Sequence, residues 1–249
     1  MTATPFLPLK RVVRRLVGER LYLGAAFARK AAAKLVRQAI GREPIFHVQF
    51  RCRCEDHQYH VCPEGLGPGS VVYSFGVGKD IRFELSLIKR FGVQVFAFDP
   101  SPVAVEWIQA QALPPELHFF ELGVGTSDGT ADFHSPRDVT DPNWSTVVDA
   151  SGAAATARCP VRRLVSISRM LGHNRIDILK LDIEGAEYGV IEDWLEDGPE
   201  VHQFLVEFHH RMASVGSQKT RDVVRLLNSH GYRLFHVSRT EPEFSFIKV

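Results

Sequence analysis

Acids and glycines follow three apolar runs in this sequence of 249 residues, and their types suit cofactor binding and proton transfer. The runs end in the segments SFGVGKD (74–80), FDPS (98–101) and KLDIEGAE (180–187). Short runs of β-branched and aromatic residues are typical of buried parallel strands. Ligands of an open α/β sheet bind in the crevice outside the carboxyl ends of its strands. We therefore expect these segments to line one crevice.

The first two segments predict a nucleotide-type cofactor site. Gly76 and Gly78 let the backbone approach a ligand closely, and a helix that starts after them presents unpaired N–H groups. Asp99 comes about twenty residues later, where a carboxylate accepts hydrogen bonds from ribose hydroxyls. Each signal also has a structural interpretation, which is a plain strand-to-helix turn for the glycines and an N-cap for Asp99.

Candidate catalytic residues follow the third run and a later run that ends in VEFHH (206–210). Asp182 or His209 suits a general base that removes the proton of a hydroxyl acceptor, and Glu184 is a further catalytic candidate. The alternative is a divalent cation held by Asp182, Glu184 and Glu207. Hard oxygen ligands of this kind favour Mg²⁺. The metal hypothesis is the weaker one, because carboxylates at strand ends are common without a metal. A structural role stays open for His209.

The composition is that of a soluble globular protein, with 45% hydrophobic residues, 24% charged residues and a net charge of +1. One domain of roughly 200 residues plus an appendage fits the length. No apolar run reaches the roughly 18 residues of a transmembrane helix. Four cysteines in a chain of this size do not suggest a disulfide framework. A reducing cytosol, and hence a cytoplasmic location, is therefore expected.

Residues 1–42 are predicted to form a basic helical arm, because they hold ten lysines and arginines against the single acid Glu19. An amphipathic helix is expected from residue 9 to residue 17, and a second helix from 25 to 40 is expected to end at Gly41. The helices either pack on the domain or bind an anionic membrane surface or an acidic partner through residues 9–42. Nucleic acid is disfavoured, because no basic groove with aromatic platforms follows.

Residues 43–65 are predicted to form an N-terminal hairpin before a core at 66–249. Apolar side chains and cysteines alternate with polar ones from Phe46 to Cys54, which favours a half-buried strand that uses cysteine as a small core residue. A zinc site is the weaker alternative, because the spacing lacks the paired C-x₂₋₄-C of structural zinc sites. Its ligands would come from Cys52, Cys54, His57, His60 and Cys62.

Further elements follow from the periodicity of the core. A helix opened by Asp80 is expected to bury Ile81, Leu85 and Ile88. The third strand, at 117–125, is predicted to form a hairpin with residues 131–135. The polar segment 137–158 is then expected to be a functional loop, in which Trp144 either closes over a ligand or anchors the loop to the core. Two β segments close the chain.

The order of these motifs resembles the S-adenosylmethionine-dependent methyltransferases of the FkbM type and their methyltransferase-like relatives. The motifs are the glycine turn, Asp99, LGVGTSDGT, KLDIEGAE and VEFHH, and the resemblance covers roughly residues 45–249. It implies a Rossmann-like α/β fold with helices on both faces of a seven-stranded, mostly parallel sheet. In that sheet, one antiparallel strand is inserted between two of the six parallel ones. The basic helical arm is not part of the resemblance.

The resemblance also implies a cofactor, S-adenosylmethionine, and roles for individual residues. Gly76 and Gly78 would pass its methionine part, Asp99 would hold its ribose, and Asp182 would face the transferred methyl. Gly123 and Val124 would lie near the adenine. The residues predicted to bind the cofactor are Ser74, Phe75, Gly76, Gly78, Asp99, Pro100, Gly123, Val124 and Asp182.

Ser74 departs from the family pattern, because an acid usually ends the first strand at its position. We therefore expect weaker binding of the cofactor. The implied reaction is O-methylation of a hydroxyl on a small polar or glycosylated molecule. One alternative is a non-catalytic protein of the same fold that binds a partner through the basic arm. An NAD-dependent enzyme is disfavoured, because Ile81 stands where the full G-x-G-x-x-G motif has its last glycine.

Overall fold

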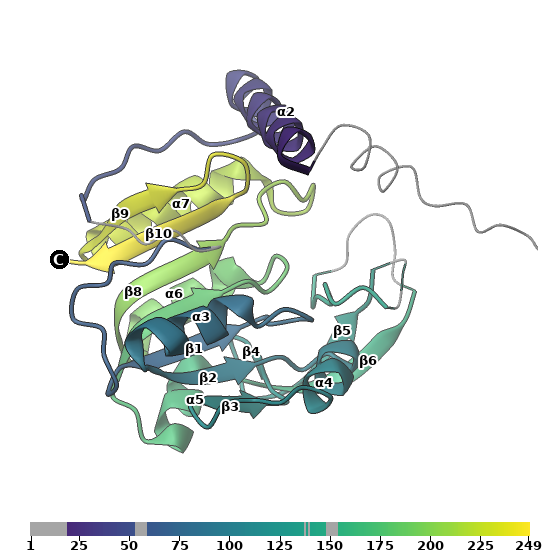
Figure 1. Ribbon diagram of the computed structural model, residues 1–249, viewed down its shortest axis with the longest axis vertical. Helices are drawn as coiled ribbons and strands as arrows, with labels where there is room; N and C mark the ends of the chain where they lie inside the picture. The colour runs from purple at the N-terminus through teal and green to yellow at the C-terminus, as the bar shows by residue number, and fades with distance from the viewer. Residues whose placement is uncertain (1–18, 53–58, 137, 139, 148–153) are drawn as a thin grey trace, which may run out of the picture.

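The computed structural model describes residues 19–52, 59–136, 138, 140–147 and 154–249. Its centre is a seven-stranded sheet in the order β3-β2-β1-β7-β8-β10-β9 (Figure 1). Strand β10 is antiparallel to both of its neighbours, β8 and β9, and the other pairs are parallel. The predicted sheet is thereby confirmed. The strands are β1 (Val71–Phe75), β2 (Gln94–Phe98), β3 (Leu117–Phe120), β7 (Arg175–Leu181), β8 (Glu200–Glu207), β9 (Tyr232–Val237) and β10 (Glu243–Lys248).

Helices cover both faces of this sheet, as predicted (Figure 1). Helices α3 (Arg82–Phe91) and α4 (Pro102–Gln109) pack on one face, and α5 (Leu164–Leu171), α6 (Glu187–Asp197) and α7 (Gly216–Ser229) pack on the other. Successive residues of a strand pack on opposite faces of the sheet, each of which has its own hydrophobic core. Val72 packs in the core under α3, and Tyr73 packs in the core under α6. Both residues are fully buried, which explains why the strand sequences are continuously apolar.

The predicted hairpin between residues 117–125 and 131–135 is wrong. A second, three-stranded sheet takes its place. The first of these segments splits at residues 121–122, and its second half joins β6 instead of β5. Strand β5 pairs antiparallel with β6, which the sequence analysis placed partly in a loop. Alternate residues of β6, Cys159 and Val161, are buried against Phe133, and only this pairing forms that small core. The strands are β4 (Gly123–Val124), β5 (Gly129–His134) and β6 (Thr156–Arg162).

The strand predicted from Phe46 to Cys54 is also wrong in its described part, because residues 46–52 dock on the large sheet without pairing as a strand. The N–H groups of Gln49 and Phe50 both donate to the carbonyl oxygen of Leu234, at 2.7 and 3.1 Å. The ring of Phe46 packs edge-on against Phe244 on β10, 5.7 Å between centroids. Phe46, Phe50 and Cys52 thus pack on the cores of the large sheet, whereas Val48 is exposed. The expected turn of the hairpin lies outside the described residues.

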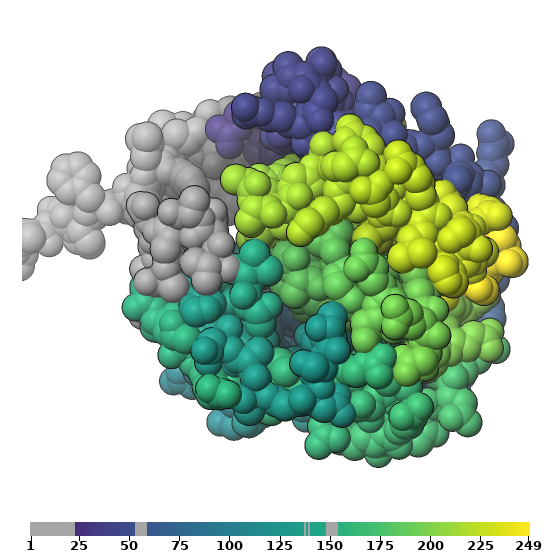
Figure 2. Space-filling model, turned by 180° about the vertical axis from the view of Figure 1, so that it is seen from behind, coloured from purple at the N-terminus to yellow at the C-terminus, as the bar shows by residue number. Residues whose placement is uncertain are grey.

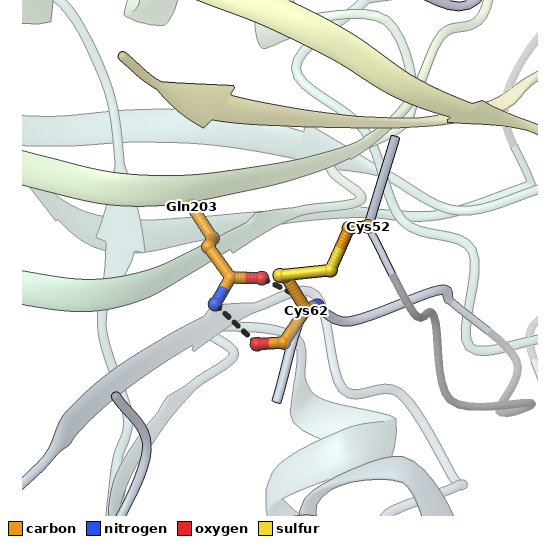
Figure 3. The surroundings of a disulfide bond; sticks show 3 residues. All are labelled: Cys52, Cys62 and Gln203. Atoms are coloured by element: carbon orange, nitrogen blue, oxygen red, sulfur yellow. Dashed lines mark hydrogen bonds between the residues drawn. A yellow bond between two sulfur atoms is a disulfide. The ribbon is translucent and has the colours of Figure 1, made fainter. Parts of the chain in front are cut away.

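A disulfide between Cys52 and Cys62 corrects the expectation of free cysteines (Figure 3). It also contradicts the zinc alternative, because it uses two of the proposed thiolates; Cys54 and His57 lie outside the described residues. The side chain of Gln203, fully buried on β8, accepts from the Cys62 N–H at 2.8 Å and donates to the Cys62 carbonyl oxygen at 2.7 Å (Figure 3). The bridge therefore closes a loop whose C-terminal end is fixed to the sheet.

Helix α2 (Glu19–Ala39) packs on the C-terminal part of the chain, which is the first of the two interpretations of the arm (Figures 1 and 2). Its basic side chains make the contact: Lys34 donates to the carbonyl oxygens of Ser238 and Glu241 at 2.8 and 2.9 Å. Lys34 and Arg37 also lie 3.4 and 2.8 Å from Glu43, which is only 2% exposed. Burial by itself raises the pKa of Glu43, but hydrogen bonds and charges from its basic neighbours hold that pKa far below its usual range. Leu35 and Val36 are exposed instead.

Two further expectations concern the arm. Gly41, with φ +73°, follows the end of α2 as predicted. The helix expected at residues 9–17 lies outside the described residues. No helix in the described part of the chain is long and apolar enough to cross a membrane.

Replacing both Cys52 and Cys62 by serine should lower the free energy of unfolding by about 2–3 kcal/mol, because the loop that the bridge closes is short. Urea unfolding of the wild type with and without dithiothreitol should show the same difference. The matched control is Cys159→Ser, which removes a buried free thiol and should keep the response to the reductant. An unfolding midpoint of the wild type that dithiothreitol leaves unchanged would contradict the bridge.

Candidate active site

The turn after β1 is packed directly on the backbone that follows β7. Gly76 has φ +76°, and a Cβ atom on it would lie 1.7 Å from the carbonyl oxygen of Asp182. The Gly76 N–H donates to the Phe98 carbonyl oxygen at 3.0 Å, which ties the turn to β2 as well. A side chain at position 76 is therefore excluded both by conformation and by contact. The glycine was predicted for close approach to a ligand; it also serves close approach to Asp182.

Asp99 fixes the glycine turn from the end of β2. Its Oδ2 accepts from the Gly78 N–H at 2.9 Å, and its Oδ1 accepts from the N–H and the hydroxyl of Ser101. Burial raises the pKa of Asp99, and these hydrogen bonds oppose the rise. The N-cap of α4 is Ser101, whose Oγ accepts from the Ala104 N–H. The N-cap interpretation of Asp99 is therefore wrong, and a ribose-binding role stays a prediction.

One cavity at the carboxyl ends of β1, β2 and β7 collects most of the predicted site. Its lining also includes Lys180, Trp144 and residues of α3, which the sequence analysis did not assign to the cofactor. Ser74 does not line the cavity; it lies fully buried behind the wall. The predicted residues in the lining are Phe75, Gly76, Gly78, Asp99, Pro100, Gly123, Val124, Asp182 and Glu184.

Helix α3 brings an unexpected carboxylate into the cavity wall. Leu85 and Ile88 are only half-buried, so the predicted apolar face is rotated toward Phe83, Glu84 and Leu87, which are buried. The hydroxyl of Ser74 donates to Oε1 of Glu84 at 2.6 Å. Burial raises the pKa of Glu84, and the charge of Lys180 and the Ser74 hydrogen bond oppose this effect.

Asp182 lies between a phenol and a cation. The Tyr59 hydroxyl donates to its Oδ2 at 3.2 Å, and Nζ of Lys180 lies 3.8 Å from the same oxygen. Lys180 is 4% exposed and also donates to the Gly76 carbonyl oxygen at 3.1 Å. Burial and the charge of Asp182 raise the pKa of Tyr59 well above its usual value, so the phenol remains a donor. Both contacts hold the Asp182 carboxylate in place.

His209 lies between two carboxylates, that of Glu184 in the turn after β7 and that of Glu187 at the start of α6. Its Nε2 lies 3.1 Å from Glu184 and its Nδ1 lies 2.8 Å from Glu187, which is fully buried. Burial alone lowers the pKa of His209, but the hydrogen bonds to Glu184 and Glu187 outweigh it and raise that pKa to about 11. Among the described residues, Glu184 is the only non-glycine in the left-handed region, with φ 55°. Such strain is concentrated at functional sites.

The structure does not assemble the divalent-cation site that was predicted from Asp182, Glu184 and Glu207. Among the residues that the structure describes, the group close enough to share one ion is Asp182, Glu184 and His209, and it does not include Glu207. Both ring nitrogens of His209 already face carboxylates, Nε2 that of Glu184 and Nδ1 that of Glu187. Hard cations such as Mg²⁺ also prefer oxygen ligands to imidazole. We derive no step through a metal.

Trp144 anchors its loop to the core, one of the two roles weighed for it, and closure over a ligand stays a prediction. It lines the cavity, and it packs against the small core of Phe133, Cys159 and Val161. Its indole nitrogen is buried and has no hydrogen-bond partner within the described parts of the chain. The adjoining Ser145 hydroxyl donates to the Glu184 carbonyl oxygen at 2.6 Å, which ties the loop to the strained residue.

Tyr59, Glu84, Lys180 and Glu187 were missed as site residues. Two of them carried a usable signal. Lys180 is a cation inside the apolar run of β7, two residues before Asp182, so both side chains lie on one face of the strand. Glu84 follows Phe83 and precedes Leu87 on the buried side of a helix. Tyr59 carried no signal, because its place depends on the disulfide loop.

The fold and the cavity define a Rossmann-like α/β protein with a cofactor-type cleft. The family described as Methyltransferase FkbM domain matches residues 74–234, which is more than half of the chain. The chain belongs to this family.

Relatives and solved structures of lower similarity also match. Probable methyltransferase-like protein 24 of Homo sapiens is 29% identical over 194 residues, which is 74% of this chain and 46% of that protein. The rat protein of the same name is 32% identical over 176 residues, 66% of this chain and 42% of that protein. The chain thus spans less than half the length of these relatives. A tRNA (uracil-54, C5)-methyltransferase of Pyrococcus abyssi, solved with S-adenosyl-L-homocysteine, aligns at 13% identity and a TM-score of 0.32. That alignment covers 73% of this chain and 34% of the other, and it carries no argument about function.

Replacing Glu207 by glutamine should stabilise the protein at high pH. Burial and the charge of Asp182 raise the pKa of Glu207 to about 8. The unfolded chain loses this proton at a lower pH than the folded one, so the wild type loses stability as the pH rises from about 4.5 to 8. Urea unfolding at pH 9 should show a higher midpoint for Glu207→Gln, whereas the midpoints at pH 5 should agree. The control Glu192→Gln, at an exposed site, should match the wild type at both values.

Proposed function

We propose that this protein is an S-adenosylmethionine-dependent O-methyltransferase that acts on a hydroxyl of a small polar or glycosylated molecule. The proposal rests on one observation: the glycine turn, Asp99 and Asp182 open into the same cavity, at the carboxyl ends of three adjacent strands. Membership of the FkbM methyltransferase family supports the reaction class. Asp182, placed between Tyr59 and Lys180, supports transfer to oxygen, because a hydroxyl acceptor must lose its proton.

The chain's own residues fit the cofactor. Gly76 and Gly78 both line the cavity, and Asp99 presents a buried carboxylate beside them. Glu84 Oε2 and the Trp144 indole nitrogen are buried in the wall, and neither has a hydrogen-bond partner in the described part of the chain. Orphaned polar atoms of this kind are rare in native proteins and indicate a polar ligand.

S-adenosylmethionine, when bound, supplies an electrophilic methyl group and a good leaving group. The chain then has two tasks, which are to position the acceptor and to take its proton. In this proposal, the Asp182 carboxylate takes the proton, and the Tyr59 hydroxyl and Lys180 hold that carboxylate in place. Orientation of this kind supplies much of the barrier reduction when the leaving group is already good.

His209 and Glu184 position this site and exchange no proton with the acceptor. A doubly protonated imidazole cannot accept a proton. His209 instead holds Glu184, in the turn that follows Asp182, and Glu187, the first residue of α6. Asp182 therefore remains the general base in the proposed reaction.

The alternative of a non-catalytic binding protein rested on Ser74, which stands where the family has an acid. Glu84 lies 2.6 Å from Ser74 and returns a carboxylate to that place, so this reason is weakened. The partner hypothesis for residues 9–42 stays a prediction. Lys34 and Arg37 of α2 are already paired with Glu43 and are not available to an anionic surface. The cytoplasmic location also stays a prediction, and the disulfide contradicts its premise.

Calorimetric titration with S-adenosylmethionine and S-adenosylhomocysteine should show binding, and NAD should not bind. Asp99→Ala should weaken the binding of both ligands by about 10- to 100-fold, because a buried charged acceptor is lost. Asp128→Ala is the matched control, since this acid is exposed and does not line the cavity. A wild type that binds neither ligand would sink the proposed cofactor site.

Asp182→Asn should retain the cofactor, while methyl transfer falls by about 10²- to 10⁴-fold, the usual contribution of a general base. The acceptor is found first by screening polar and glycosylated molecules with methyl-labelled cofactor. Transfer is then measured in a single turnover, with binding followed by calorimetry on the same variant. Unchanged transfer would show that Asp182 is not the base.

A further inference from the structure

Glu84 is a fully buried acid, and only one of its two carboxyl oxygens has a hydrogen-bond partner among the described residues. It is 1% exposed, it lies on the inner side of α3, and it lines the same cavity as Gly76 and Gly78. Its Oε1 accepts the Ser74 hydroxyl at 2.6 Å. Its Oε2 is buried and has no hydrogen-bond partner among the described residues. Leaving a buried carboxylate oxygen unpaired is strongly unfavourable, so a donor is expected there.

The protein does not provide that donor from its nearest cation. Lys180 acts on Glu84 through its charge, but its Nζ donates to the carbonyl oxygens of Phe75 and Gly76 and lies 3.8 Å from Asp182. Asp80, another acid in the lining, is paired with Arg82 instead. Glu84 is thus an acid in the cavity wall with an acceptor atom free for a ligand, and the ligand group that suits it is a cation with N–H donors.

We propose that Glu84, oriented by Ser74, binds the α-ammonium group of the methionine portion of the cofactor. This inference rests on the proposed function and adds the residue that recognises the amino-acid end of the ligand. The methionine portion is expected to run along the glycine turn, which ends at Asp80. Helix α3 begins two residues later, at Arg82, and Glu84 lies in its first turn. The acid that the family usually carries on the first strand is therefore supplied by the following helix, ten residues later in the chain.

The pairing explains why a serine suits position 74. An acid there would face Glu84 across a buried gap, and two buried carboxylates at hydrogen-bond distance repel each other. The Ser74 hydroxyl instead donates to Oε1 of Glu84. Oε2 of Glu84 is left without a hydrogen-bond partner among the described residues. Ser74 is a positioning residue in this scheme, and Glu84 is the residue that touches the ligand.

The test compares S-adenosylhomocysteine with its α-hydroxy analogue, in which a hydroxyl replaces the ammonium group and the carboxylate is kept. Calorimetry on the full chain should show that the wild type binds S-adenosylhomocysteine about 10- to 100-fold more tightly than the analogue. Glu84→Gln keeps the size of the side chain and its contact with Ser74, but it should lose most of this preference. Its affinity for the analogue should stay close to that of the wild type.

Asp80→Asn is the matched control, because Asp80 lines the same cavity with its oxygens already paired, and it should keep the preference. The inference is overturned if Glu84→Gln retains the full preference, or if it loses both ligands equally, which would indicate a purely structural role. Should Glu84→Gln fail to fold, Glu84→Asp is read in the same way, with a reduced preference expected. A wild type that binds neither ligand would instead remove the proposed cofactor site, and this inference with it.

Discussion

The contact between Gly76 and the backbone of Asp182 is the constraint on which the candidate site depends. It brings the turn after β1 against the turn after β7. The Gly76 N–H donates to the Phe98 carbonyl oxygen, and the Asp182 N–H donates to the Phe75 carbonyl oxygen. Three neighbouring strands are thereby joined at their carboxyl ends. Because of this joint, Asp99 and Asp182, which are far apart in the sequence, open into one cavity. Any side chain at position 76 would separate them.

Around this joint the structure collects more acids than cations. Lys180 and the protonated His209 stand among Asp182, Glu184 and Glu187. The excess is relieved by protons: burial raises the pKa of Glu207 to about 8 and that of Glu243 to about 7. Perturbed pKa values of this kind are concentrated at functional sites.

Outside the core, polar contacts decide how the chain is arranged. Helix α2 is attached through Lys34, Arg37 and the buried Glu43, which leaves several of its apolar side chains exposed. The segment before β1 is attached by the Cys52–Cys62 disulfide and by Gln203, and it carries Tyr59 to Asp182. The site therefore depends on a segment that belongs neither to the sheet nor to the helices that cover it.

The sequence by itself determined the sheet and the part of the cavity lining that lies at the ends of its strands. Continuous apolar strands, the glycine turn and the acids after β2 and β7 are local features, and the topology of a parallel sheet places them together. The tertiary structure alone decided the rest. Glu84 became a wall residue because α3 is rotated away from its most apolar face, and Tyr59 reached Asp182 through a covalent bridge between cysteines that looked unpaired. Residues 45–52 and 129–134 took other partners than predicted, since alternation fixes which side chains are buried but not the surface that covers them.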